Sequence, residues 1–325
     1  MVNPLKRKKI SFVTPCYNEE DNVDQLHREI LAAFTPYLNQ YDYEHIFIDN
    51  ASKDQTRARL RDLARNNPNI KLIFNTRNFG HIRSPYHGLL QATGDAVQLM
   101  ASDLQDPPSL IPQFIQKWEE GFKVVMGVKS QSRESPFMFA IRKTYYDLIS
   151  KIADVQLEKN FTGFGLYDQQ ILHELRKIND PYPYFRGLIS DLGFPSAKVY
   201  FTQPNRIRGI SANNFYTLYD MAMLGITSHS KVPLRIATLS GFAMSTLSFL
   251  ILLGYLAAKL LYWDRFAFGF APLILSIFFF GSVQLFFIGI IGEYIGFIYT
   301  QLLRRPLVVE QERINFDTER KGPQS

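Results

Sequence analysis

Two long apolar stretches in the last third of the chain constrain its fold more than any other feature. The stretch Ile236–Ala258 contains no charged residue, and in Phe266–Leu303 the only charged residue is Glu293. A helix needs about 20 apolar residues to cross a bilayer, so each stretch is long enough. The alternative is a buried hairpin in a soluble protein, but uncharged stretches of this length, rich in Phe and Leu, rarely occur in a soluble core. We therefore expect two transmembrane helices within residues 234–303.

Basic residues beside these stretches predict their orientation, because the cytoplasmic flanks of membrane helices carry an excess of Lys and Arg. They are Lys231 and Arg235 before the first stretch, and Arg304, Arg305 and Arg313 after the second. The short connection at 261–265 is aromatic and balanced in charge. We expect an inner (plasma) membrane protein with both termini in the cytoplasm and this connection on the outer side.

The N-terminus and the cysteine content agree with a cytoplasmic location for the first part of the chain. Residues 6–9 are basic, but the apolar run after them is short and contains Pro15, which argues against a signal peptide. Cys16 is the only cysteine, so no internal disulfide can form, as is usual in a reducing compartment. The net charge of +6 comes without an RNA-binding motif or metal-knuckle spacing. We therefore expect an anionic membrane surface as the partner, and no nucleic acid.

Before the apolar stretches, strand-like and helix-like segments alternate. The expected strands are Ile10–Thr14, Tyr43–Ile48, Ile70–Asn75, Val97–Met100 and Val124–Val128. The expected helices are Glu20–Leu38, Asp54–Asn66, Ile82–Ala92 and Ile111–Glu120. This alternation predicts an α/β fold with a mostly parallel sheet and helices on both faces.

Two amphipathic segments follow, and both could lie flat on the membrane. Phe137–Ala153 is explained as well by packing on the sheet, whereas Phe215–Ile226 leads into the first apolar stretch and is expected at the interface. In the tail, the β-prone segment Leu307–Val309 could return to the cytosolic domain or pair with a neighbouring subunit, and we expect a homo-oligomer. The expected division is a cytosolic domain at 1–212, a juxtamembrane amphipathic helix at 213–233, the transmembrane helices at 234–303 and a cytosolic tail at 304–325.

Polar clusters directly follow the first four expected strands. They are Thr14–Glu20, Ile48–Asp54, Asn75–Gly80 and Ser102–Gln105. One such cluster is routine helix capping, but several at the carboxyl edge of a parallel sheet indicate a site for a polar ligand. Neither Gly-x-Gly-x-x-Gly nor a P-loop follows any of these strands, which argues against a dinucleotide site.

The fourth cluster indicates a divalent cation. Asp103 and Gln105 follow an apolar strand, and alternate residues of an extended chain point to one side. A pair of hard oxygen ligands suits Mg²⁺ or Mn²⁺ already bound to a substrate diphosphate. The alternative is a polar turn that caps the next helix.

Together these motifs resemble the family 2 glycosyltransferases of the GT-A fold. The resemblance is closest to the polyprenyl-phosphate glycosyltransferases, which include dolichol-phosphate mannose synthases and bactoprenol glucosyltransferases, and it covers nearly all of the chain. Its motifs are Pro15–Glu19, Asp49–Ser52, Arg77–Gly80, Asp103–Pro108 and Arg206–Ser211 with Leu224–Ser228. It implies that 1–212 is a GT-A catalytic domain. By similarity to bacterial relatives, it implies inverting transfer of glucose from UDP-glucose to undecaprenyl phosphate at the cytoplasmic membrane face.

The resemblance also implies roles for individual residues. The nucleotide would be bound by Pro15, Tyr17, Glu19, Asp49, Asn50, Ser102 and Asp103. Asp103 and Gln105 would hold Mg²⁺ or Mn²⁺ across the diphosphate. Arg206, with help from Arg208, would neutralise the diphosphate as it departs, so Asp103 and Arg206 are the expected catalytic residues. Contact with phospholipid headgroups is the alternative for both arginines.

The acceptor needs little chemical activation. A phosphate monoester has a second pKa of about 6, is largely dianionic at pH 7 and is already a nucleophile. Lys129, Arg133 and Arg142 follow the fifth expected strand and are candidates to bind this phosphate, with a solvated basic face as the alternative. Displacement in a single step would invert the anomeric centre.

The sequence departs from the family pattern at several positions. Ala101 stands where the family often has the first Asp of Asp-x-Asp-x-Gln, which would weaken metal affinity. Asn50 replaces the second Asp of a common pair, which would alter base or ribose recognition. Gly163–Gly165 lacks the carboxylate of a Gly-Asp-Phe-Arg element, and Ala212 replaces a frequent lysine.

Two other functions stay open on the sequence alone. A processive polysaccharide synthase would carry Gln-x-x-Arg-Trp and more membrane helices, but here Ile207 follows Gln203–Arg206. A nucleotide-sugar-binding membrane protein without catalytic activity would fit Ala101. It would not explain why Asp103 and Arg206 are retained.

Overall fold

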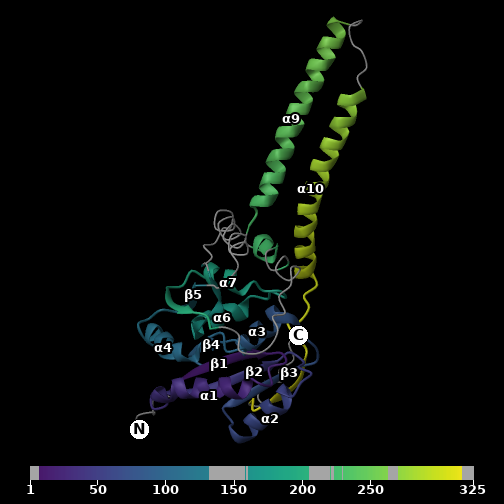
Figure 1. The fold of residues 1–325 in the computed structure, drawn as a ribbon. Coiled ribbons are helices and arrows are strands. Elements are labelled where there is room, and N and C mark those ends of the chain that lie inside the picture. Colours follow the sequence, from purple (N-terminus) through teal and green to yellow (C-terminus); the bar gives the residue numbers. More distant parts are fainter. Residues whose placement is uncertain are drawn as a thin grey trace.

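The computed structural model shows the alternation of strands and helices that the apolar periodicity predicts. It describes residues 7–131, 158, 160–204, 220, 223–228, 230–262 and 270–316. Within these ranges the strands are β1 (Lys8–Cys16), β2 (Tyr41–Asp49), β3 (Ile70–Asn75), β4 (Ala96–Leu99), β5 (Val124–Gln131), β6 (Phe161–Asp168), β7 (Ser196–Thr202) and β8 (Glu310–Ile314). The helices are α1 (Val23–Phe34), α2 (Thr56–Asn66), α3 (Gly80–Gln91), α4 (Ile111–Glu119), α6 (Gln169–Lys177), α7 (Phe185–Asp191), α9 (Val232–Leu261) and α10 (Phe270–Leu302), with 3₁₀ turns at Thr35–Tyr37 and Pro108–Leu110 (Figure 1).

The described strands form one 8-stranded sheet in the order β7-β5-β6-β4-β1-β2-β3-β8. At its centre β4, β1, β2 and β3 are parallel neighbours, and β7 is parallel to β5. Only β6 and β8, among the described strands, run antiparallel to their neighbours. This topology confirms the predicted mostly parallel α/β sheet, and it brings the carboxyl ends of β1 to β4 to one edge.

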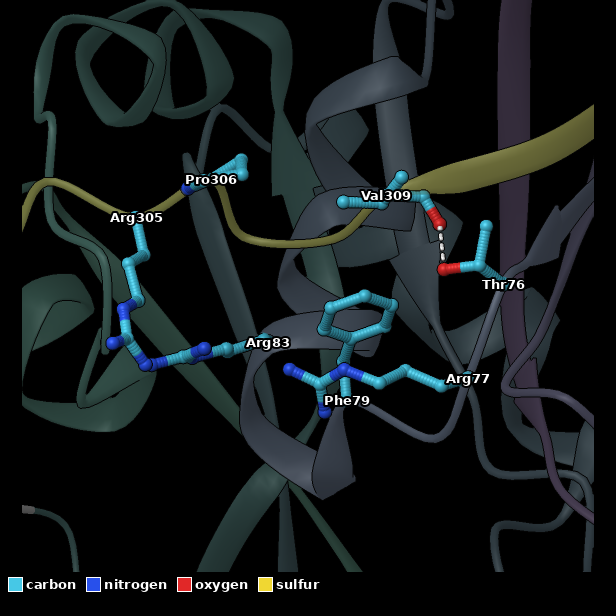
Figure 2. A pocket seen from close by; sticks show the side chains of 7 residues that line it. All are labelled: Thr76, Arg77, Phe79, Arg83, Arg305, Pro306 and Val309. Carbon is cyan, nitrogen blue, oxygen red and sulfur yellow. Dashed lines mark hydrogen bonds between the residues drawn. The ribbon is translucent and has the colours of Figure 1, made fainter.

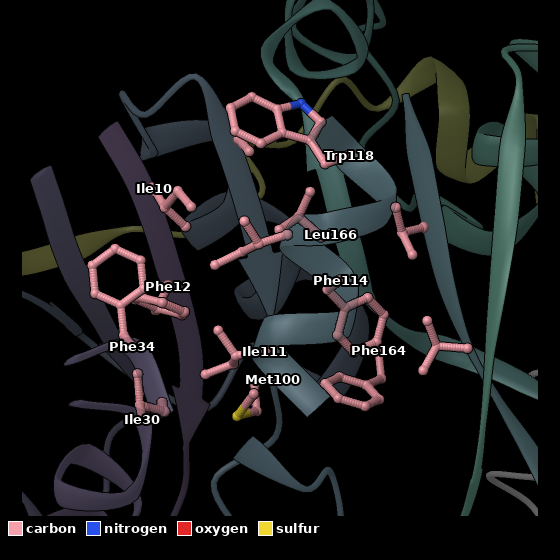
Figure 3. Close-up of a cluster of buried hydrophobic side chains, with 14 of the residues drawn as sticks. Ile10, Phe12, Ile30, Phe34, Met100, Ile111, Phe114, Trp118, Phe164 and Leu166 are labelled. Carbon is pink, nitrogen blue, oxygen red and sulfur yellow. The ribbon is translucent and has the colours of Figure 1, made fainter. Parts of the chain in front are cut away.

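Helices cover both faces of the sheet, as expected for strands whose alternate residues are apolar on each side. On one face Phe12 of β1 packs with α1 and α4, and Figure 3 shows Phe34, Ile111 and Phe114 in this cluster. The helix α2 covers β2 and β3 on the same face. On the other face Val13 of β1 packs with α3 and α6. The sheet is therefore buried on both sides, and its carboxyl edge is left for polar side chains.

The observed boundaries explain where the sequence interpretation was incomplete. β3 has the predicted bounds, whereas the first helix begins at Val23 because the Glu19 carbonyl accepts hydrogen bonds from the N–H groups of Asn22 and Val23 and closes a turn. The sequence pattern predicted no elements between Phe161 and Thr202, where β6, α6, α7 and β7 lie. The segment Gly163–Gly165 belongs to β6, and a Cβ on Gly165 would lie 2.5 Å from the carbonyl oxygen of Val125. Close strand packing therefore accounts for this glycine.

The tail returns to the sheet of its own chain. β8 pairs antiparallel with β3, and the Thr76 N–H donates to the Val309 carbonyl at 3.0 Å. This is the first of the two alternatives for the tail, with the strand a few residues beyond Leu307–Val309.

The helices α9 and α10 extend side by side away from the sheet (Figure 1). Their segments Val232–Tyr255 and Ser276–Leu302 have mean hydropathies of 1.9 and 1.7, and by length and composition both could cross a membrane. The segment Phe137–Ala153, most of Phe215–Ile226 and part of the connection at 261–265 lie outside the described residues.

Candidate active site

The first two polar clusters meet at the carboxyl edge through hydrogen bonds between their turns. The Asn18 N–H donates to the Ser52 hydroxyl at 2.9 Å, and the Lys53 N–H donates to the Asn18 side-chain oxygen at 2.8 Å. The Glu19 N–H donates to the Thr56 hydroxyl at 2.8 Å. These bonds set Pro15–Glu19 against the start of α2, as expected for neighbouring parallel strands.

Asn50 joins the third cluster to this arrangement. Its side-chain nitrogen donates to the Asn78 side-chain oxygen at 2.9 Å, and its own oxygen accepts from the Phe79 N–H at 2.8 Å. The buried Asn75 side chain donates to the same oxygen at 3.2 Å. Asn50 therefore holds the loop after β3, a role that an aspartate with two acceptor oxygens could fill only in part.

Asp49 is fully buried and is neutralised by a residue that the sequence interpretation missed. The Arg57 Nε lies 2.7 Å from an Asp49 carboxylate oxygen, and the Ser52 N–H donates to the same carboxylate. Arg57 also donates to the Asn75 carbonyl at 2.8 Å. A cation can stabilise a buried carboxylate, but α2 carries Arg57, Arg59 and Arg61, and the sequence alone does not distinguish among them.

The fourth cluster is shaped by a buried carboxylate, Asp106, which belongs to the motif Asp103–Pro108 but was assigned no role from the sequence. Asp106 accepts a hydrogen bond from the Ala101 N–H at 2.9 Å, and the Gln105 N–H donates to Asp103 at 3.1 Å. Burial raises the pKa of Asp106 to about 6. Asp103 and Gln105 themselves are partly exposed at the edge, where a ligand can reach them.

Three non-glycine residues at this edge have positive φ angles. They are Asn18 (56°), Ala51 (63°) and Leu104 (60°), in the first, second and fourth clusters. Such backbone costs free energy and persists where the surrounding structure enforces it, often at functional sites. Helix capping alone does not account for these backbone conformations, so the turns are shaped for a further role.

The remaining predicted residues of the described part also lie near this edge. Tyr17 is 41% exposed, Ser102 is buried beside Cys16, and Glu19 accepts a hydrogen bond from the Asn22 side chain at 2.6 Å. Pro15 is in β1, and Lys129 in β5 lies close enough to Asp106 for its charge to lower the Asp106 pKa.

Burial, with the charges of nearby Asp49 and Glu19, raises the pKa of the Cys16 thiol well above its usual value, so Cys16 is a packed, protonated side chain. Arg133, Arg142, Arg206 and Arg208 lie outside the described residues.

The donor set at the edge fits a divalent cation that brings other ligands with it. Within the described ranges, no group of three or more His, Cys, Asp or Glu side chains gathers to form a metal cage. The Asp103 carboxylate and the Gln105 amide oxygen are hard ligands, which Mg²⁺ and Mn²⁺ prefer. Mg²⁺ commonly takes only one or two protein carboxylates and completes its octahedron with phosphate oxygens and water. A site of this kind is therefore suited to a metal-bound diphosphate.

Comparisons with known proteins cover almost the whole chain. The family model described as Glycosyl transferase family 2 matches residues 11–176. The chain is 32% identical over 311 residues, 95% of each chain, to the uncharacterized glycosyltransferase YkcC of Bacillus subtilis (strain 168). It is 33% identical over 299 residues to the bactoprenol glucosyl transferase of Shigella phage SfII, covering 92% of this chain and 96% of the relative. Among solved structures, the mannosyltransferase PcManGT from Pyrobaculum calidifontis, in complex with GDP-Man and Mn²⁺, has 15% identity and a TM-score of 0.42 over 93% of this chain and 88% of its own.

Proposed function

This chain belongs to the family 2 glycosyltransferases, and from that premise we propose that it transfers glucose from UDP-glucose to undecaprenyl phosphate. The observation that carries the proposal is the similarity to a bactoprenol glucosyl transferase over 92% of the chain. A match of that length includes the apolar helices as well as the sheet domain. A lipid acceptor would be presented beside such helices.

The nucleotide is proposed to bind among Pro15, Tyr17, Glu19, Asp49, Asn50, Ser102 and Asp103. Exposed Tyr17 offers a ring face to a base, and Glu19 offers a carboxylate to base or ribose groups. Asp49 is engaged by Arg57 and the Ser52 N–H, which supports a role that fixes the shape of the base pocket. Hydrogen bonds that preorganise a pocket lower the entropic cost of binding.

Asp103 and Gln105 would hold Mg²⁺ or Mn²⁺ at the donor diphosphate. When bound, the metal would supply positive charge that stabilises the departing UDP. Arg206, with help from Arg208, is proposed to neutralise negative charge on the diphosphate as it departs. These arginines would supply positive charge to the diphosphate even where the absence of a carboxylate at Ala101 weakens metal binding.

The acceptor phosphate is proposed to bind near Lys129, Arg133 and Arg142. One phosphate oxygen attacks C1 of glucose, the bond between C1 and the UDP oxygen breaks, and UDP leaves with the electron pair. Because the attacking phosphate is largely dianionic at pH 7, no general base has to remove a proton. Single displacement inverts the anomeric centre, so an α-linked donor would give a β-linked lipid phosphate sugar.

We place the reaction at the cytoplasmic face of the inner membrane, with both termini on that side. The basic residues that flank the apolar helices support this orientation. The nucleotide sugar is then available from the cytosol.

A transfer assay tests the proposal. The purified full chain is mixed with Mg²⁺, UDP-glucose labelled in the sugar and undecaprenyl phosphate, and label in the organic phase is counted. We expect transfer that is abolished by a chelator and reduced at least about 100-fold in Asp103→Ala, since removal of a preorganised charge contact costs that much in other enzymes. The anomeric configuration of the product, measured by NMR, tests inversion.

A matched control separates catalysis from folding. Asp62→Ala removes an exposed carboxylate whose pair with Arg65 lies on the surface of α2, and it should leave transfer unchanged. Transfer from a different nucleotide sugar, but not from UDP-glucose, would show that the proposed donor is wrong while the proposed reaction type holds. Tight UDP binding without transfer from any donor would contradict the proposed reaction.

A further inference from the structure

A cavity of about 270 Å³ lies where the chain leaves α10 and passes the loop after β3. Figure 2 shows its lining, which consists of Thr76, Arg77, Phe79, Arg83, Arg305, Pro306 and Val309. Two segments far apart in the sequence therefore build it: the third polar cluster with the first turn of α3, and the tail that leads into β8.

The cavity concentrates positive charge. In Figure 2 the side chains of Arg83 and Arg305 extend toward each other, and Arg77 lies beside Phe79 with its guanidinium 4.0 Å from the ring centroid. In the part of the chain that the structure describes, none of these three arginines forms an ion pair with a carboxylate. The buried Nε of Arg83 has no hydrogen-bond partner there either. Like charges repel at short range, so this arrangement favours a bound anion.

The cavity is held at a defined place beside the apolar helices. The second apolar segment ends at Leu302, and Arg305 is the third residue after it. The Gln301 side chain donates to Asp180 at 2.9 Å, which fixes the end of α10 on the sheet domain. On the far side of the cavity, the Thr76 N–H and hydroxyl both contact the Val309 carbonyl, at 3.0 and 3.2 Å. A helix that left the hydrocarbon at Leu302 would therefore bring this cavity to the level of the phosphate headgroups.

We propose that this cavity binds the phosphate group of an anionic membrane phospholipid, with Arg83 and Arg305 as its principal ligands and Arg77 as a third cation. Guanidinium groups present paired N–H donors that match phosphate oxygens. The bound lipid compensates the repulsion between the arginines and fastens the sheet domain to the membrane surface. This role goes beyond glycosyl transfer and does not require turnover.

Equilibrium binding tests the proposal. The full chain in detergent is titrated with phosphatidylglycerol that carries a fluorophore on one acyl chain, and the dissociation constant is measured from fluorescence anisotropy. Labelled phosphatidylcholine, with the same fluorophore, is the lipid control. Arg83→Gln and Arg305→Gln should each weaken phosphatidylglycerol binding about tenfold, the effect of losing one charge-assisted hydrogen bond.

The chain offers a matched control one residue away. Arg304→Gln removes the same charge at the membrane exit but does not line the cavity, so it should change the dissociation constant less than about twofold. Arg305→Lys keeps a charge and should restore part of the affinity. Arg305 is exposed, so its variants should fold even where Arg83→Gln does not, and thermal unfolding checks this.

Four outcomes would overturn the proposal. Equal affinity for labelled phosphatidylglycerol and phosphatidylcholine would show that the cavity does not select an anionic headgroup. A loss of affinity in Arg304→Gln equal to that in Arg305→Gln would show that general surface charge, and not the cavity, binds the lipid. Displacement by equimolar undecaprenyl phosphate would assign the cavity to the acceptor. Displacement by micromolar inorganic phosphate would show that no lipid is needed. Because no nucleotide is present, these results do not depend on whether the chain transfers glucose.

Discussion

Asp49 has no exposed surface, and the Arg57 Nε lies 2.7 Å from its carboxylate. The same guanidinium reaches the Asn75 carbonyl and the Gln311 side chain, so one residue of α2 connects β2, β3 and β8. The contacts of Arg57 therefore help to set the shape of the proposed base pocket. Arg57 also links that pocket to β8, the strand that follows the two apolar helices.

Arg57→Gln should impair both stability and donor binding. Removing one partner of a buried ion pair costs about 3–5 kcal/mol, because the remaining charge is left unpaired. We expect the KM for the nucleotide sugar to rise about tenfold, with a smaller change in kcat, since Asp49 shapes the pocket and does not contact the reacting atoms. Steady-state kinetics and thermal unfolding measure the two effects.

Arg59→Gln is the matched control for this prediction. Arg59 pairs with Asp24 at the surface, so its loss should cost less than about 1 kcal/mol. Identical KM values in Arg57→Gln and the unchanged chain would show that Asp49 keeps the pocket without this arginine.

At the level of elements, the end of the sheet opposite the site is tied together by Glu44 of β2. Its carboxylate accepts from the Ser11 hydroxyl of β1 at 2.5 Å and from the Thr93 N–H before β4 at 2.7 Å. The Lys71 ammonium of β3 lies 2.7 Å away. Burial raises the pKa of Glu44, but the hydrogen bonds and nearby ammonium groups outweigh it and lower the pKa to about 2.

This lowered pKa predicts a specific loss of stability in acid. The contribution of Glu44 is present above the pKa of an unfolded Glu, about 4.3, and is lost as the pH falls through that value toward 2. Glu44→Gln should therefore flatten the decline in unfolding temperature between pH 6 and pH 3. Glu120→Gln, which removes a surface pair with Lys117, should keep the decline of the unchanged chain. A Glu44→Gln curve parallel to that of the unchanged chain would refute this account.

The second prediction at this scale concerns β8. This strand covers the edge of β3, and Glu310 pairs with His87 of α3 at 2.5 Å. A chain that ends at Arg305 should lose several degrees of unfolding temperature and aggregate, because an uncovered strand edge pairs with other chains. A chain that ends at Phe316 keeps β8 and serves as the control. Equal unfolding temperatures and equal elution volumes for the two truncations would show that β8 contributes nothing.

For the whole molecule, β8 imposes a constraint on topology. It follows α10 in the chain yet pairs with β3, which precedes α9. The segments before α9 and after α10 therefore lie on the same side of any membrane that the two helices cross. The charge pattern of the sequence leads to the same arrangement by an independent argument.

Reporter fusions test this arrangement and the proposed sidedness together. Green fluorescent protein fused after Ser325 should fluoresce, and alkaline phosphatase at the same position should be inactive, since the tail is proposed to be cytoplasmic. Alkaline phosphatase inserted after Asp264 should be active. Activity of the C-terminal phosphatase fusion would contradict the proposed orientation.

The sequence alone determined the features that depend on neighbours along the chain. The spacing of apolar residues predicts the strands β1 to β5, the helices between them and the two long apolar helices. Because parallel strands have their carboxyl ends at the same edge, the sequence also predicts that Asp49 and Asp103 lie at one edge of the sheet. Tertiary structure decided the partners that stabilise this edge. The packing of α2 places Arg57, and not Arg59 or Arg61, beside Asp49. Asp106 accepts a hydrogen bond from the Ala101 N–H across a turn that includes Leu104, whose positive φ cannot be predicted from apolar periodicity.

The same distinction explains the cavity and the edge of the sheet. Arg61 and Glu312 form an ion pair across 251 positions, and Arg83 and Arg305 meet in one cavity only because β8 returns to β3. Periodicity is set by interactions over a few residues, so it cannot specify which distant segments will pair. The free energy of packing the complete chain decides that, and with it the placement of the charges that the sequence contains.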